Sequence, residues 1–273
     1  MRRGVAALLL LALLFLNGCG NGKQAERFQI VFFAAGKADA ILLTTDNACV
    51  LIDTGEAGFG KEIVDYLGEK GIAKIDYLIL THFDKDHVGG AAKVIRSIPI
   101  CHVLQSNYPK DSSEYRHYLT ALQQAGMEAV TVRQELNFEL DGVSFTVNPP
   151  EEELYEEDAS NNSSLIVSVT YGECSLLFLG DAENARLKEW ISSGTAAYDL
   201  VKLPHHGNWH KPLSRLLELT QPTYAVICCS EDEPEDEKTA ALLDGLQIDA
   251  YYTRVAPVLV ECDGETLRVR YDA

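Results

Sequence analysis

Four side chains that can bind a metal ion lie within six consecutive positions: His82, Asp84, Asp86 and His87. They directly follow an apolar run, Ile75–Leu80, which predicts a buried strand. Imidazole nitrogens and carboxylate oxygens together suit zinc, manganese or iron better than magnesium or calcium. A surface turn with one helix-capping Asp is the alternative, but capping needs one carboxylate and accounts for neither histidine. The spacing therefore predicts a metal site at the end of this strand.

Other predicted strands also end in side chains of these kinds, at Asp53, at Asp181 and at the adjacent His205 and His206. Taken alone, Asp181 could equally be the N-cap of a helix that begins near Ala185. A lone histidine is usually structural, but two adjacent histidines at a strand end are harder to explain in that way. These strand ends are therefore expected to converge on the loop that carries the first four candidates.

The pattern His-x-Asp-x-Asp-His over residues 82–87 resembles the metal motif of metallo-β-lactamase-fold hydrolases. The variant with Asp in place of the commoner second His is that of the ComEC/Rec2 competence proteins. The resemblance continues in the same order through four further segments and covers nearly all of the chain after residue 27: residues 51–55, 161–165, 178–181 and 202–207. It implies an α+β protein with a four-layer αββα sandwich and a metal-dependent hydrolytic activity.

The resemblance also implies roles for single residues. The expected metal ligands are His82, Asp84, Asp86, His87, Asp181 and one of the adjacent histidines, with a preference for His205. Asp181 would bridge two ions, and Asp53 would orient a ligating imidazole by accepting its free N–H. The expected catalytic groups are Asp86, His206 and Asn162. His210 matches no motif and is a candidate for the rim of the site.

Many members of the superfamily place a further histidine where this chain has amide and hydroxyl groups, at residues 161–164. One metal position would then be more open, and Asn161 or Asn162 would position substrate or a metal-bound water. Plain loop residues ahead of a strand are the alternative. Lys37 and Lys85 lie near the motif loops and could bind a substrate anion, although solvated surface lysines are the alternative.

The predicted chemistry requires two divalent cations, zinc or manganese. Two such ions about 3.5–4 Å apart can hold a bridging hydroxide at neutral pH and neutralise charge on a phosphoryl or carbonyl oxygen. We therefore expect a phosphodiesterase that acts on a nucleotide, a nucleic acid or a phosphodiester of the cell envelope. The alternatives are an ester or lactone hydrolase, and a non-catalytic surface scaffold of the same fold involved in DNA uptake or envelope upkeep.

Charge and two departures from the competence-protein pattern favour a small substrate. The formal net charge is −18, and no basic stripe of the kind found in non-specific DNA binders is visible. Residues 34–39 replace the Asp-Val-Gly-Gln-Gly-Asp of that pattern, and residues 230–237 stand where Gly-His-Pro is expected. These features favour a smaller phosphodiester over DNA that is degraded during uptake.

The N-terminus predicts export. Met1-Arg2-Arg3 and the apolar run over residues 5–16 are typical of a secretory signal, since the run is too short to span a bilayer comfortably. Leu-Asn-Gly-Cys over residues 16–19 resembles a bacterial lipobox. We expect removal of residues 1–18, lipidation of Cys19, a tether over residues 19–27 and a hydrolase domain over residues 28–273, outside the cytoplasm and anchored to the cell membrane. An ordinary signal peptide with an incidental Cys is the alternative.

Apolar patterning predicts alternating strands and helices, including one helix over residues 88–95 and a strand over residues 127–132. The six cysteines after Cys19 lie mostly in apolar runs and lack Cys-x-x-Cys spacing. This favours packed thiols over a metal knuckle, while an even count in an exported protein leaves disulfides open.

Overall fold

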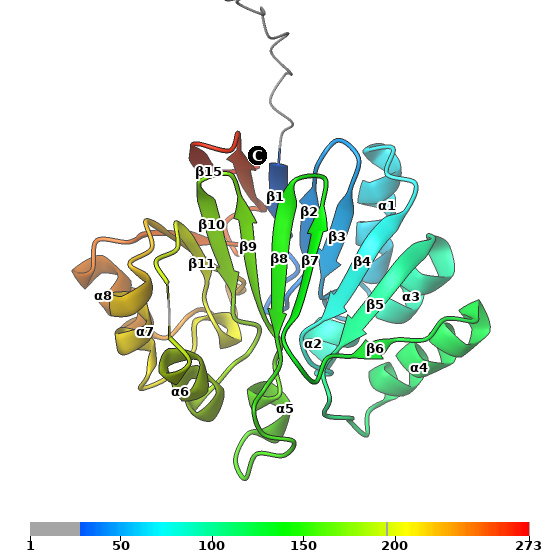
Figure 1. Cartoon of the computed structure of the whole chain (residues 1–273), viewed down its shortest axis with the longest axis horizontal. Helices are drawn as coiled ribbons and strands as arrows, with labels where there is room; N and C mark the ends of the chain where they lie inside the picture. The colour runs from blue at the N-terminus through cyan, green and yellow to red at the C-terminus, as the bar shows by residue number, and fades with distance from the viewer. Residues whose placement is uncertain (1–27, 195, 273) are drawn as a thin grey trace, which may run out of the picture.

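The computed structural model describes residues 28–194 and 196–272, so the predicted signal peptide, Cys19 and tether lie outside the described residues. Two β-sheets stack face to face, and helices cover the outer face of each sheet (Figure 1). The predicted four-layer α+β sandwich is thereby confirmed. Among the described residues, no helix has both the length and the apolar character needed to cross a membrane.

The first sheet has the strand order β15-β14-β1-β2-β3-β4-β5-β6. Its strands in chain order are β1 (Phe28–Phe32), β2 (Ile41–Thr44), β3 (Cys49–Ile52), β4 (Ile75–Leu80), β5 (Ile100–Gln105), β6 (Val130–Thr131), β14 (Val258–Cys262) and β15 (Leu267–Tyr271). Strands β3 to β6 run parallel to one another, and the remaining pairs are antiparallel. The carboxyl ends of β3 and β4 therefore share one edge, where the loop with the four candidate ligands begins.

The second sheet has the strand order β13-β12-β11-β10-β9-β8-β7. Its strands are β7 (Leu136–Leu140), β8 (Val143–Asn148), β9 (Ile166–Tyr171), β10 (Cys174–Phe178), β11 (Leu200–Lys202), β12 (Tyr224–Ile227) and β13 (Asp249–Tyr252). Strands β10 to β13 are parallel. Because β10 and β11 end at the same edge, the segments that follow them bring Asp181 and the adjacent histidines together.

Three apolar layers hold the sandwich together. The central layer lies between the sheets and includes the stacked rings of Phe32 and Phe178, whose centroids are 6.0 Å apart. Helices α1 (Gly60–Glu69), α3 (Ala91–Ser97) and α4 (Ser113–Ala125) bury apolar side chains against the first sheet. Helices α6 (Asn184–Ser192), α7 (Leu213–Thr220) and α8 (Glu237–Gly245) do the same on the second. Two single-turn helices, α2 (Lys85–Val88) and α5 (Ala159–Asn162), lie at the end of the sandwich that carries the candidate ligands.

The helix predicted over residues 88–95 is confirmed in part: α3 covers Ala91–Ser97, but Gly89 and Gly90 separate it from α2, which ends at Val88. Both glycines have ordinary negative φ values, −57° and −78°. They are required by close packing: a Cβ on Gly89 would lie 2.5 Å from the Ala57 nitrogen, and one on Gly90 would lie 2.3 Å from the Thr54 oxygen. The absence of side chains thus lets the ligand loop pack onto the loop that follows β3.

The strand predicted over residues 127–132 is shortened to Val130–Thr131. This strand is at the edge of the sheet and pairs only with β5. Met127 and Ala129 instead pack against the apolar layer under the helices, so their apolar character reflects helix contact.

One disulfide joins the two sheets. Cys174 begins β10 in the second sheet and Cys262 ends β14 in the first, and the bridge closes a sequence separation of 88 residues. The other described cysteines are free thiols, of which Cys101 is exposed. The bridge therefore restricts the unfolded chain over the segment from β10 to β14.

We predict that replacing both Cys174 and Cys262 with Ser lowers the free energy of unfolding by about 2–4 kcal/mol. Chemical denaturation followed by circular dichroism measures this change, and Cys101→Ser is the matched control because its thiol is exposed and unbridged. Equal stability of the double variant and the control would show that the bridge does not form.

A buried ion pair makes a second connection between the sheets. Lys202 is the last residue of β11, and Asp39 lies in the segment before β2. The Nζ of Lys202 donates to Oδ2 of Asp39 and to the Gly180 carbonyl, the latter at 3.1 Å. The Lys202 and Asp39 side chains are at most 1% exposed. Burial acts to lower the pKa of Lys202, but the charges of Asp39 and Asp181 raise it above its ordinary value. The lysine is therefore charged inside the protein.

We predict that Lys202→Met lowers the free energy of unfolding by about 3–5 kcal/mol, because it leaves the buried Asp39 carboxylate without its cation. Lys61→Met, which removes a solvent-exposed pair with Asp65, is the control and should leave stability nearly unchanged. Urea unfolding curves of both variants compare them, and a Lys202→Met curve that overlays the control would contradict the prediction.

Candidate metal centre

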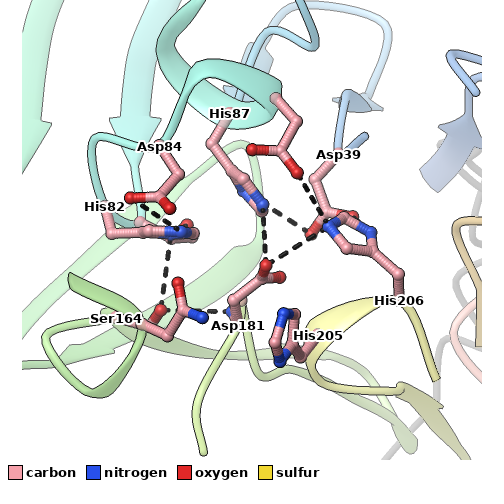
Figure 2. A network of polar contacts seen from close by, with 12 residues as sticks. Asp39, His82, Asp84, His87, Ser164, Asp181, His205 and His206 are labelled. Carbon is pink, nitrogen blue, oxygen red and sulfur yellow. Dashed lines mark hydrogen bonds and ion pairs between the residues drawn. The ribbon is translucent and has the colours of Figure 1, made fainter. Parts of the chain in front are cut away.

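The Asp181 carboxylate lies between imidazoles that come from the two halves of the sandwich (Figure 2). Its Oδ2 is 3.2 Å from Nε2 of His87, in α2, and 3.2 Å from Nε2 of His206, in the turn after β11. Asp86 Oδ2 is 3.2 Å from the same His206 nitrogen. His87, His206 and Asp181 are buried, whereas the Asp86 side chain is 21% exposed. We call these four residues the Asp181 cluster.

The Asp181 cluster fits a divalent transition metal. In the cluster, Nε2 of His87 and His206 and Oδ1 of Asp181 are buried and make no well-aligned hydrogen bond with any described residue, and the same holds for Nε2 of the neighbouring His82. Buried polar atoms of this kind are costly unless a ligand satisfies them. Ligand atoms about 2.0–2.1 Å from a tetrahedral ion lie about 3.3 Å from one another, close to the 3.2 Å separations in the cluster. Two imidazoles and two carboxylates are also a donor set that zinc, manganese and iron accept.

The charges in the cluster favour a cation. Burial acts to lower the pKa values of His87 and His206, but Asp181 outweighs it, so that the pKa of His87 is raised well above its ordinary value and that of His206 to about 9. Burial likewise acts to raise the pKa of Asp181, but the two imidazoles lower it well below the usual range. Without a metal, protons on the imidazoles balance the carboxylates, and a cation would provide the same balance.

Asp53 holds His87 from the opposite side. Its Oδ2 is 2.8 Å from Nδ1 of His87, while its Oδ1 and Oδ2 accept hydrogen bonds from the backbone N–H and the hydroxyl of Thr81. Asp53 has a positive φ of 56°, which an Asp tolerates better than most residues. This contact orients the ring so that Nε2 of His87 points toward Asp181.

His82 and Asp84 lie beside the Asp181 cluster. The ring centroids of His82 and His87 are 4.1 Å apart, and His82 Nε2 is 3.9 Å from Asp84 Oδ1. Burial lowers the pKa of His82 to about 4, so the ring is neutral and available as a ligand. Asp84 Oδ1 accepts hydrogen bonds from Lys110 and Ser160. The described residues thus offer clusters that could bind two metal ions.

The structure brings His206, and not the preferred His205, into the cluster. Both residues have positive φ values, 45° and 55°, and their side chains diverge. His206 Nδ1 is 2.9 Å from the Cys228 carbonyl, which leaves Nε2 for Asp86 and Asp181. His205 Nδ1 is instead 3.1 Å from Glu183 Oε1. Because of this left-handed turn, which the sequence does not reveal, the two rings contact different neighbours.

The two asparagines make protein contacts. Both ends of the Asn162 amide are occupied by backbone groups, since Oδ1 accepts from the Arg186 N–H and Nδ2 donates to the Glu157 carbonyl. Asn161 Nδ2 donates to Glu183 Oε1 at 2.7 Å. The structure therefore places Asn162 in a role that holds the loop before β9, and Asn161 beside Glu183.

The lysines proposed for substrate binding form surface ion pairs. Lys37 Nζ is 3.5 Å from a Glu233 carboxylate, and Lys85 Nζ is 3.3 Å from one of Glu56, with the Lys85 side chain 72% exposed. Lys110, by contrast, contacts the candidate ligand Asp84.

Sequence reasoning assigned no role to Lys110, Lys202 or Ser164. Ser164 Oγ is 3.4 Å from His82 Nδ1 and accepts from the Asp181 N–H, so it touches two candidate ligands. For Lys202, the sequence did contain an indication of a role, namely a lysine at the end of an otherwise apolar strand. Lys110 comes from a loop with no such signal.

Comparison with known proteins places the chain in a family. Residues 34–231 match the model of the Metallo-beta-lactamase superfamily. Recombination protein 2 of Haemophilus influenzae is 26% identical over 212 residues, which are 76% of this chain and 25% of that protein. ComE operon protein 3 of Bacillus subtilis is 26% identical over 174 residues, 63% of this chain and 22% of that protein. The chain thus spans about a quarter of the length of these relatives.

Solved structures show the same fold at low sequence identity. The metallo-beta-lactamase fold protein YhfI from Bacillus subtilis has a TM-score of 0.57 and 11% identity, covering 87% of this chain and 100% of that one. CmlA, a diiron beta-hydroxylase from Streptomyces venezuelae, has a TM-score of 0.56 and 14% identity, covering 90% of this chain and 54% of that one. Together with the match over most of its length, these findings show that the chain belongs to the metallo-beta-lactamase superfamily and has homologues among the ComEC/Rec2 competence proteins.

Proposed function

We propose that this chain is a metal-dependent hydrolase of phosphodiesters. The observation that carries the proposal is the Asp181 carboxylate between His87 and His206, whose buried Nε2 atoms lie 3.2 Å from it but make no well-aligned hydrogen bond with any described residue. A scaffold would gain nothing from keeping several such atoms unsatisfied at one point. A site that binds a metal accounts for all of them.

One cation would be held by Asp86, His87, Asp181 and His206. A second would be bound with contributions from His82, Asp84 and Asp181. Either zinc or manganese suits these ligands. Such ions, when bound, lower the pKa of water and neutralise charge on a phosphoryl oxygen. Asp53 keeps His87 in the tautomer that leaves Nε2 free, and the Cys228 carbonyl does the same for His206. The exposed edge of Asp86 marks the side from which substrate would enter.

A small phosphodiester fits the surface better than a long polyanion. The net charge of −18 opposes the approach of a polymer of phosphates, and Lys37 and Lys85 already pair with glutamates. Lys110, whose side chain is 34% exposed beside Asp84, is the cation best placed to meet a substrate phosphate. The name of the Haemophilus influenzae relative, Recombination protein 2, supports a substrate that contains nucleotides.

We also propose that the protein acts outside the cytoplasm, on a lipid anchor at Cys19. The signal-like N-terminus motivates this location, and the Cys174–Cys262 bridge supports it, since disulfides persist mainly in oxidising compartments.

We predict that Asp86→Ala loses bound metal and slows cleavage of a generic phosphodiester by at least about 100-fold, because removing a ligand costs more than the 10–100-fold typical of its outer partners. Metal content by mass spectrometry and cleavage of bis-p-nitrophenyl phosphate measure the two effects. Asp111→Ala is the matched control, since the Asp111 side chain is 97% exposed. A metal-free, inactive wild type would favour a non-catalytic scaffold.

We predict that Cys19→Ala releases the protein from the membrane of its own bacterial host, because a lipidated cysteine would be the attachment point. Fractionation and blotting of membrane and soluble fractions give the distribution, with Cys101→Ser as the control. Retention of the Cys19→Ala protein on the membrane would count against the anchor.

A further inference from the structure

A second group of potential ligands lies next to the Asp181 cluster and shares no residue with it. Glu183, His205 and His210 each offer one ligand atom, and these atoms lie within 4.8 Å of one another. His205 Nδ1 is 3.1 Å from Glu183 Oε1 and 3.3 Å from His210 Nε2. None of the three residues is needed by the proposed hydrolytic centre. We call them the Glu183 group.

The spacing of the Glu183 group resembles that of metal ligands. Two nitrogens and an oxygen about 2.0–2.1 Å from a tetrahedral ion would lie about 3.3 Å from one another. The separations of 3.1 and 3.3 Å agree with this value, as do those in the Asp181 cluster. Two of the three separations thus match the spacing of metal ligands, and one ligand atom of each residue lies within 4.8 Å of the others.

Hydrogen bonding alone accounts for these contacts poorly. A neutral His205 carries at most one hydrogen on Nδ1, and Glu183 Oε1 and His210 Nε2 both face that nitrogen. If Nδ1 donates to the carboxylate, His210 Nε2 can only share the same hydrogen. If His210 donates to Nδ1, the single lone pair of that nitrogen is used, and Glu183 Oε1 then faces it at 3.1 Å without a hydrogen. One cation between the three atoms satisfies them together.

The three side chains are also held in place. The left-handed backbone turn fixes His205, and its ring stacks on that of His210 with an interplanar angle of 17°. Glu183 and His210 are buried, at 7% and 6% exposure. Asn161 donates to Glu183 Oε1 at 2.7 Å and so orients the carboxylate, as outer partners of metal ligands do. The group is therefore ordered before any ligand arrives.

We propose that Glu183, His205 and His210 bind an additional divalent transition metal of the zinc type, separate from the two ions of the proposed hydrolytic centre. Three protein ligands leave one position of a tetrahedral ion open, and the 22% exposure of the His205 side chain gives that position access to solvent. The open position would accept water or an anionic oxygen.

The test uses the full chain, stripped with a chelator and dialysed against zinc. Zinc per chain is measured for the wild type, His210→Asn, Asp86→Ala and the combined variant, with His117→Asn as the control because His117 is exposed on α4. We expect His210→Asn to lose one zinc per chain that Asp86→Ala retains. The combined variant should lose this zinc as well as the metal that is lost by Asp86→Ala. Anomalous diffraction at the zinc edge should place a peak between Glu183 Oε1, His205 Nδ1 and His210 Nε2 of the wild type.

Equal zinc content in His210→Asn and the wild type, or no anomalous peak at this point, would overturn the proposal. The diffraction measurement on the wild type decides the question even if a variant fails to fold. The proposed hydrolytic function is tested separately, since a peak in the Glu183 group with none at Asp181 would support this site and remove the support for the other.

Discussion

The contact of one carboxylate with two imidazoles organises the functional end of this molecule. Asp181 comes from the second sheet and meets His87, which the first sheet delivers, and His206, which the second sheet delivers by a separate strand. Burying these groups in one place is tolerable only if their charges balance. The other contacts at this end, from Asp53 to His87 and from the Cys228 carbonyl to His206, serve to keep the three groups facing one another.

Strand β10 connects this site to the rest of the fold. At its start, Cys174 is bridged to the first sheet, and three residues after its end Asp181 contacts His87. Between them, the Gly180 carbonyl accepts from Lys202, which also reaches Asp39. The two sheets are thus joined by a covalent bond at one end of β10 and by charged groups at the other. A shift of one sheet along the other would disturb both ends.

The second acidic run contributes structure as well as charge. Within residues 231–237, Glu235 pairs with Arg254 at 3.2 Å. Asp236 accepts from the Trp209 N–H at 2.6 Å, and its own N–H donates to the Gly207 carbonyl. The loop therefore supports the turn that separates His205 from His206.

Local patterns in the sequence determined the class of fold, the position of most strands, and the residue types that meet at the site. Alternating apolar residues indicate which positions are buried. The candidate metal ligands of the loop over residues 82–87 lie close together in the sequence. Only the tertiary structure decided which of His205 and His206 faces Asp181, that Asn162 bonds to backbone groups, and that Glu183 and His210 share a neighbour. These outcomes depend on a left-handed turn and on contacts between residues distant in sequence. The direction of a side chain follows from the backbone angles and the packing around it, and neither is encoded in the residue type or its spacing.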